Sequence, residues 1–191
     1  MRLPNIVLTQ GWGRNTEATL KNTAAALALL FLLTLPAQAQ EQPPFEIFSG
    51  FSWLNSEGTH FFGWQSDLTF NFKSRYGFTA DFSGQYGRVT VPGIGRFDVA
   101  EYQFLFGPRI AARGEKFTGF VHGLVGFAQI SVGGGSASGL ALGLGGGLDL
   151  NIGDQYALRI FQIDYVPAKI SGIWGHQSRL GVGFVLKPGG P

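Results

Sequence analysis

Apolar and polar side chains alternate along the segment from Phe62 to Lys73. Large apolar side chains occupy every even position except that of Ser66, and every odd position carries glycine or a polar residue. A period of two is that of a β-strand whose two faces meet different surroundings. The segment therefore predicts a strand with one apolar face and one polar face.

Seven more segments show the same alternation or a weaker form of it. They are Phe45–Leu54, Phe78–Tyr86, Glu101–Ile110, Phe117–Ser131, Leu140–Asn151, Tyr156–Val166 and Arg179–Lys187. Strands with one apolar face and one polar face are typical of barrels that stand in lipid around a polar interior. The pattern predicts an all-β fold, an eight-stranded antiparallel transmembrane up-and-down β-barrel.

Three places in this pattern need a special explanation. Pro108 lies inside a predicted strand and has no N–H to donate, so we expect a bulge or a strand end there. Arg159 is out of phase with Gln162 and Asp164, which requires a bulge or an interfacial position. The register of residues 117–131 has two solutions, and we favour the one with His122 inward; Val121, Val125 and Phe127 then face lipid, whereas the other register places Gln129 in the lumen.

The connections between the predicted strands alternate in length. Asn55–Phe61, Gly87–Val99, Val132–Ser138 and Pro167–His176 are expected as long loops, and Ser74–Tyr76, Gly114–Lys116 and Gly153–Asp154 as short turns. Outer-membrane barrels have short periplasmic turns and longer outside loops. An even number of strands then leaves both chain ends on the periplasmic side.

The first 39 residues have the three parts of a secretory signal peptide. Arg2, Arg14 and Lys21 precede the apolar run 24–35, and a small-x-small pattern ends at Ala39. A membrane anchor is the alternative, but a spanning helix needs about 20 apolar residues and this run is shorter. We expect cleavage after Ala39, so that residues 1–39 are a signal peptide and residues 40–191 form the outer-membrane β-barrel domain.

The charge of the predicted mature chain argues against a nucleic acid partner. Three of the 14 basic residues and one of the 12 acidic residues precede Gln40, which leaves 11 of each and a net charge of zero. Binding to phosphates needs a clustered basic face. The sequence has no cysteine, so disulfides and zinc–thiolate sites are excluded.

The polar faces of the predicted strands give a nearly balanced set of inward charges. The inward residues are Asp67, Lys73, Asp81, Glu101, Arg109, Asp149, Asp164 and Arg179, with Gln65, Gln85, Gln103 and Gln162 among them. Eight strands enclose a lumen that side chains fill, so we favour a plug of paired charges over an ion path. Gly143, Gly145 and Gly147 form an inward row, and we expect bulky neighbours such as Arg109 to fill the space beside it.

Tyrosine and tryptophan residues lie near the predicted strand ends, which indicates an aromatic girdle at the membrane–water boundary. They are Trp53, Trp64, Tyr76, Tyr86, Tyr102, Tyr156 and Tyr165. The alternative is a stacking surface for sugar or nucleic acid, which their scatter over several strands disfavours.

The sequence offers no convincing catalytic, cofactor-binding or metal-binding residue. His60, His122 and His176 are far apart and lack clustered partners of the kind that metals need. His176 and Ser178 have the His-x-Ser spacing of the lipid A deacylase barrels, but no acid follows Ser178 to complete a triad. The glycine runs lack the lysine and the strand-to-helix context of a phosphate loop.

Several short stretches resemble the β-barrel domain family of outer-membrane protein A. Residues 48–54 (FSGFSWL) resemble that family's opening strand, and 104–109, 120–122, 144–149 and 162–165 resemble its later strands in the same order. The resemblance covers nearly the whole mature chain. It implies an eight-stranded barrel with a structural, adhesive or unassigned role and no catalytic residue to transfer. Many such barrels end on an aromatic residue, whereas this chain continues past Phe184 and Leu186 into Lys187 and a Pro-Gly-Gly-Pro tail.

Together these observations predict a non-enzymatic, monomeric protein of the outer membrane of a diderm bacterium. Its partners would be outer-membrane lipid and an extracellular molecule that meets the loops, and it would need no cofactor. Two alternatives stay open: a narrow pore for small solutes, and a soluble lipocalin-like barrel with its apolar face turned inward around a ligand.

Overall fold

The computed structural model describes residues 43–91, 93 and 95–189, which form one antiparallel sheet. The signal peptide expected over residues 1–39 lies outside the described residues. The strands are β1 (Phe45–Ser56), β2 (Thr59–Lys73), β3 (Tyr76–Val91), β4 (Gly95–Arg113), β5 (Phe117–Val132), β6 (Gly135–Asn151), β7 (Tyr156–Tyr165), β8 (Ala168–Ile170), β9 (Ile173–Gly175) and β10 (Gln177–Leu186). Within the described residues no helix is long and apolar enough to cross a membrane.

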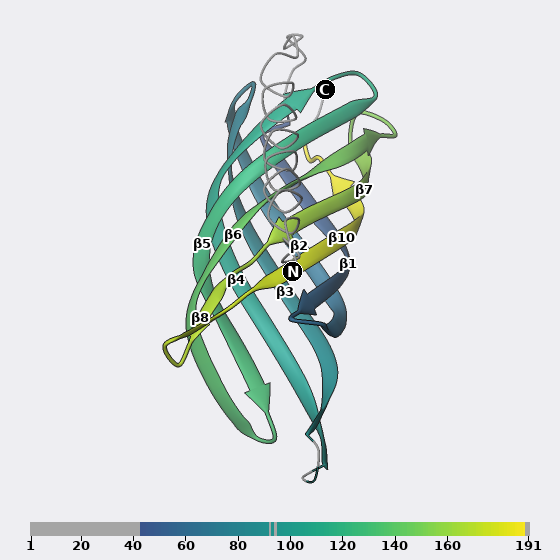
Figure 1. Ribbon diagram of the computed structural model, residues 1–191. Helices are drawn as coiled ribbons and strands as arrows, with labels where there is room; N and C mark the ends of the chain where they lie inside the picture. Colours follow the sequence, from purple (N-terminus) through teal and green to yellow (C-terminus); the bar gives the residue numbers. More distant parts are fainter. Residues whose placement is uncertain (1–42, 92, 94, 190–191) are drawn as a thin grey trace, which may run out of the picture. The chain divides into compact units, whose positions relative to one another are not determined.

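The sheet closes into a ring of eight strands, as the alternation predicts (Figure 1). From β1 to β7 consecutive strands pair with each other, β7 pairs with β10, and β10 pairs with β1 to complete the ring. The short β8 continues the line of β7 along β6, so the two together occupy one place in the ring. Closure gives each of the eight places in the ring two neighbours, which is what a sheet surrounded by lipid requires for its backbone hydrogen bonds.

The turns at one end of the barrel are short, as expected. They lie between β2 and β3, between β4 and β5, and between β6 and β7, and we call this the short-turn end. At the opposite end, the long-hairpin end, the β3–β4 and β5–β6 hairpins project beyond the β1–β2 turn (Figure 1).

The prediction of a long loop over Asn55–Phe61 is wrong. Strands β1 and β2 continue into a turn of two residues, Glu57 and Gly58, both with positive φ, and Asn55 Oδ1 accepts a hydrogen bond of 3.0 Å from Gly58 N. The other three expected loops are also largely paired strand, because β3, β4, β5 and β6 extend into them and β8 and β9 form a small hairpin within Pro167–His176. Backbone pairing continues where the side-chain alternation fades, so the alternation underestimates strand length.

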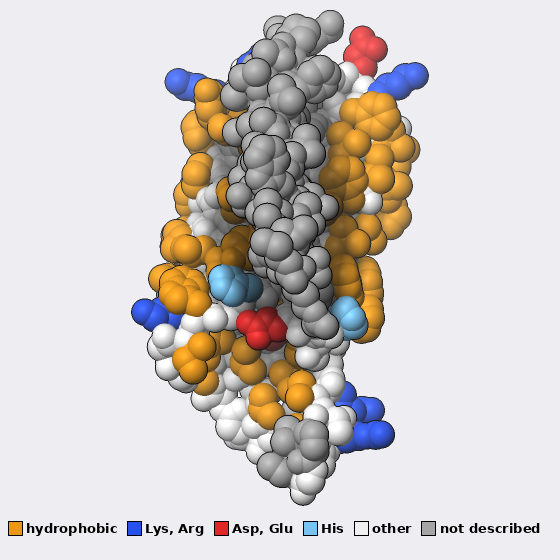
Figure 2. Space-filling model, viewed as in Figure 1, with side chains coloured by type: hydrophobic (Ala, Val, Ile, Leu, Met, Phe, Trp, Pro, Cys, Tyr) orange, Lys and Arg blue, Asp and Glu red, His pale blue; other side chains and the backbone are white. Residues whose placement is uncertain are grey.

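The apolar face of the barrel points outward and the polar face inward. Leu144 and Phe184 are 69% and 70% exposed, whereas Asp81 and Gln85 are completely buried. Figure 2 shows apolar side chains gathered over the visible barrel wall and few of them at the hairpin tips. This orientation is the opposite of a lipocalin-like barrel, and that alternative is therefore wrong.

The structure answers the three questions that the sequence pattern raised at Pro108, Arg159 and residues 117–131. The expectation of a bulge or strand end at Pro108 is wrong: β4 continues, Pro108 pairs with Phe78, and the β4–β5 register is the same on both sides of it. The proline has no backbone N–H, so the strand loses only one ladder hydrogen bond at this position and continues past it. The bulge expected at Arg159 is confirmed, since the register of β7 shifts against both neighbours and turns Arg159 inward. His122 is buried and Phe127 is exposed, as we favoured.

Apolar side chains fill parts of the lumen toward both ends. Phe48, Ala157 and Val185 cluster toward the short-turn end. Leu54, Phe61 and Val99 cluster toward the long-hairpin end, and Leu105, Leu124, Ala128, Ala141, Val166 and Ala168 form a third cluster. Charged residues occupy the lumen between these apolar groups and also the short-turn end itself.

Candidate functional site

Arg179 on β10 joins two carboxylates in the centre of the lumen. Its Nη1 and Nη2 donate to the two oxygens of Asp81 at 2.8 and 2.7 Å, and its Nη2 and Nε donate to Asp164 Oδ2 at 2.8 and 3.1 Å. Ser83 and Gln103 accept further bonds from Nη1. All of these side chains are buried, so the guanidinium links β3, β4, β7 and β10 across the barrel.

Arg159 on β7 forms a second centre toward the short-turn end. It donates to Asp149 Oδ1 at 2.8 Å and to Asp67 Oδ2 at 2.6 Å. Its guanidinium carbon also lies 4.1 Å from the ring centre of Phe48 and 4.4 Å from that of Phe120. Guanidinium groups stack well on aromatic faces, so hydrogen bonds and ring contacts together offset the cost of burying this charge.

A third group of charges closes the short-turn end. Glu46 on β1 lies 3.1 Å from Arg109 Nη1 and accepts a bond of 2.7 Å from Arg113 Nη2. Asn71 donates to the same carboxylate at 2.9 Å. Lys187, just after β10, donates to Asn151 at 2.6 Å, and burial lowers the pKa of its amine.

His122 and the inward Gly145 contact Asp164, the carboxylate that Arg179 also binds. His122 Nε2 lies 2.8 Å from Asp164 Oδ1. A Cβ placed on Gly145 would lie 2.0 Å from the same oxygen, so only glycine admits this carboxylate at that point. The space beside Gly147 is filled by Phe120, so the expectation that Arg109 fills the glycine row is wrong; Arg109 instead stacks on the Phe120 ring at 4.0 Å.

Eleven of the twelve predicted inward residues are buried in the lumen. The exception is Lys73, which is exposed because the β2–β3 register shifts between Asn71 and Lys73 and turns it out of the inward row. The sequence reasoning missed Glu46. Its inward row on β1 also carries Phe48, Ser52 and Leu54, so polarity does not distinguish the two faces of this strand.

The histidines and the serine considered as metal ligands or catalytic residues do not come together in one site. Within the described part of the chain no group of three His, Cys, Asp or Glu residues could hold a metal ion. His176 contacts the Tyr165 hydroxyl through Nδ1 and stacks on the Tyr165 ring. Ser178, the other half of the His-x-Ser pair, is exposed and pairs across the ladder with Asn55.

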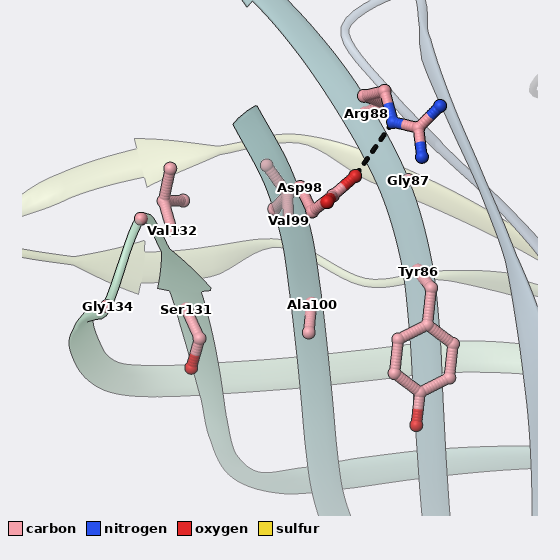
Figure 3. A pocket seen from close by; sticks show the side chains of 10 residues that line it. Tyr86, Gly87, Arg88, Asp98, Val99, Ala100, Ser131, Val132 and Gly134 are labelled. Atoms are coloured by element: carbon pink, nitrogen blue, oxygen red, sulfur yellow. Dashed lines mark hydrogen bonds and ion pairs between the residues drawn. The ribbon is translucent and has the colours of Figure 1, made fainter. Parts of the chain in front are cut away.

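The outer face of β3, β4 and β5 carries two hollows toward the long-hairpin end. One, of about 600 Å³, is lined by Tyr86–Arg88, Asp98–Ala100 and Ser131–Gly134 (Figure 3). Arg88 Nε donates to Asp98 Oδ1 at 2.7 Å at its edge. The other hollow, of about 200 Å³, is lined mainly by aromatic residues, namely Trp64, Phe82, Tyr102, Phe104 and Phe127, with Ser83, Gln103 and Gln129.

The aromatic residues predicted to form a girdle lie on the outer face. Trp64, Tyr76, Tyr86, Tyr102, Tyr156 and Tyr165 are exposed, and Trp53 is partly exposed. Tyr86 and Tyr102 share a hydrogen bond of 3.2 Å between their hydroxyls. These aromatic residues come from β1, β2, β3, β4 and β7, and the girdle itself stays a prediction.

Solved structures of small outer-membrane barrels resemble this fold. Neisserial surface protein A aligns over 75% of this chain and 95% of its own, with a TM-score of 0.61 and 12% identity. The outer membrane protein OprG of Pseudomonas aeruginosa aligns over 77% of this chain and 96% of its own, with a TM-score of 0.51 and 14% identity. No protein-family model and no curated protein matches the sequence. The fold is thus that of the small outer-membrane barrels of the outer-membrane protein A type, as the sequence resemblance implies.

Proposed function

We propose that this chain is a non-catalytic, monomeric, integral outer-membrane protein with a structural or surface-interaction role. Export would use the signal peptide expected at residues 1–39, and the short-turn end would face the periplasm. The long-hairpin end would then meet the outside and any extracellular partner. The lumen would serve as a rigid plug.

The observation that carries this proposal is the charge network in the lumen. Arg179 and Arg159 are bonded on several sides to buried carboxylates that come from four different strands. A carboxylate that acts as a general acid or base must reach a substrate, whereas Asp81, Asp149 and Asp164 are almost inaccessible to any molecule from outside. Charges held in this way favour a packed interior over a catalytic centre or a water-filled path.

Conductance measurements separate this proposal from the alternative of a narrow pore. The mature chain, folded into a planar lipid bilayer, should give no steady single-channel current. Closure of the barrel is checked in parallel by electrophoresis, because unboiled protein should migrate differently from boiled protein. A steady large conductance from protein that passes this check would replace the plug with a transport role.

Localisation has its own test. Cells that express the full chain should yield the protein in the outer-membrane fraction, shortened at its N-terminus by the length of the signal peptide. Recovery in the soluble fraction would contradict the proposed function.

A further inference from the structure

The outward side chains of β3, β4 and β5 change from apolar to charged in ordered rows toward the long-hairpin end. Phe82, Phe104 and Phe127 are cross-strand neighbours in the first row. Tyr102 lies in the next row, paired with Gly84 and Gln129. Tyr86, Ala100 and Ser131 follow, and the ion pair of Arg88 and Asp98 comes last. Over a few residues the surface thus passes from a face suited to hydrocarbon to one suited to water.

The two hollows follow this order. The small hollow lies among the aromatic side chains, with Tyr102 and Gln129 on its border. The larger hollow lies beyond them, beside the small side chains of Ala100 and Ser131, which share a row with Tyr86 and border the row of the ion pair. Its volume of about 600 Å³ is within the range of sites that bind small molecules.

The polar edge of the larger hollow has hydrogen-bond donors and acceptors that can bind a ligand. Within the described structure Arg88 is bonded to Asp98 through Nε, which leaves its two Nη nitrogens available to a ligand. The side chains of Arg88 and Asp98 are 67% and 83% exposed, and an exposed ion pair contributes little stability, so either partner can turn to another group at small cost. Guanidinium nitrogens match phosphate oxygens, and a carboxylate with a serine hydroxyl can bind sugar hydroxyls.

We propose that this surface binds one phosphorylated glycolipid of the outer leaflet. An acyl chain lies against the small aromatic hollow, and the sugar head group fills the larger one. A head-group phosphate accepts hydrogen bonds from the Nη nitrogens of Arg88. The occupant is a lipid because the hollows continue the barrel's lipid-facing wall, and a glycolipid because the larger hollow has room and hydroxyl-binding groups for more than a single phosphate.

Binding is tested on the folded mature barrel in detergent by native mass spectrometry. The probes are a phosphorylated glucosamine-disaccharide lipid, the same lipid without its phosphates, and phosphatidylglycerol. The first should bind about tenfold or more tightly than either of the others, since a hydrogen bond to a charged group contributes about 1.5 to 3 kcal/mol and 1.4 kcal/mol is a factor of ten. Equal binding of all three would show an unspecific lipid annulus and overturn the proposal.

Two pairs of matched variants locate the site. Ser131→Phe fills the larger hollow, whereas Ser136→Phe adds the same ring to the neighbouring strand at the position paired with Ser131. Arg88→Gln removes the phosphate donor, whereas Arg96→Gln removes an exposed charge farther along the same hairpin. The first member of each pair should weaken binding about tenfold and its control should leave binding unchanged. Equal effects within both pairs would refute the site.

The inference rests on the proposed placement in the outer membrane, but the two can fail separately. The binding experiment uses purified, folded protein and does not depend on export. Absent binding by a barrel that fractionates with the outer membrane would therefore refute the lipid site alone.

Discussion

Replacing Arg179 with methionine is the sharpest test of the plugged lumen. Methionine keeps much of the side-chain volume and removes every hydrogen bond that the guanidinium makes to Asp81 and Asp164. His122 still holds Asp164 at 2.8 Å, so the penalty falls mainly on Asp81, which retains a bond of 2.7 Å from Gln65. Breaking one side of a buried pair costs about 3 to 5 kcal/mol, and we expect a loss in that range.

The loss is measured from urea unfolding of the barrel in lipid vesicles, as a lower free energy of unfolding with an unchanged slope. Arg88→Met is the matched control, because it also removes an arginine from an aspartate but at an exposed pair, where about 0 to 1 kcal/mol is expected. Adding Asp81→Asn to Arg179→Met should restore part of the loss, since it removes the stranded charge. Equal small losses at Arg179 and Arg88 would show that water solvates the lumen and would refute the packed plug.

Two further substitutions test the wall of the barrel. Leu144→Arg places a charge on the lipid face near the middle of β6 and should cost about 2 to 4 kcal/mol in the same unfolding assay; a cost near zero would mean that the strand faces the other way. Gly145→Ala should also destabilise the barrel, by roughly 1 to 3 kcal/mol, because its Cβ would lie 2.0 Å from Asp164 Oδ1 and 2.5 Å from the carbonyl oxygen of Ile163. Gly123→Ala is the control, since a Cβ there meets nothing within 4 Å, and similar losses at the two glycines would contradict the packing around Asp164.

The sequence by itself determines the class of fold and, for the clearly alternating strands, which residues share a face. Alternation is a property of single residues along one strand, and it needs no knowledge of neighbours. Segments such as Phe62–Lys73 therefore predict both the strand and the residues that share each of its faces. The near balance of acidic and basic inward residues likewise predicts that they pair, because an unpaired ion in a closed lumen is too costly.

The sequence does not predict the direction of a side chain where a strand's register depends on its neighbours. A shift of one residue sends every later side chain to the opposite face, so the register shift before Lys73 removes this charge from the lumen, while the bulge at Arg159 brings another in. The alternation also underestimates the hairpins, since β3 and β4 stay paired to Val91 and Gly95.

Only the tertiary structure decides which charges pair and where the outer face is hollow. Arg179 and Asp81 are 98 residues apart in the chain, and they meet because ring closure brings β10 beside β1, so that the inward side chains of β10 reach those of β3 across one narrow lumen. The hollow beside Ala100 exists because small side chains from two strands become neighbours in one cross-strand row. A single strand's pattern carries no information on such neighbours, since they depend on the register of the whole ring.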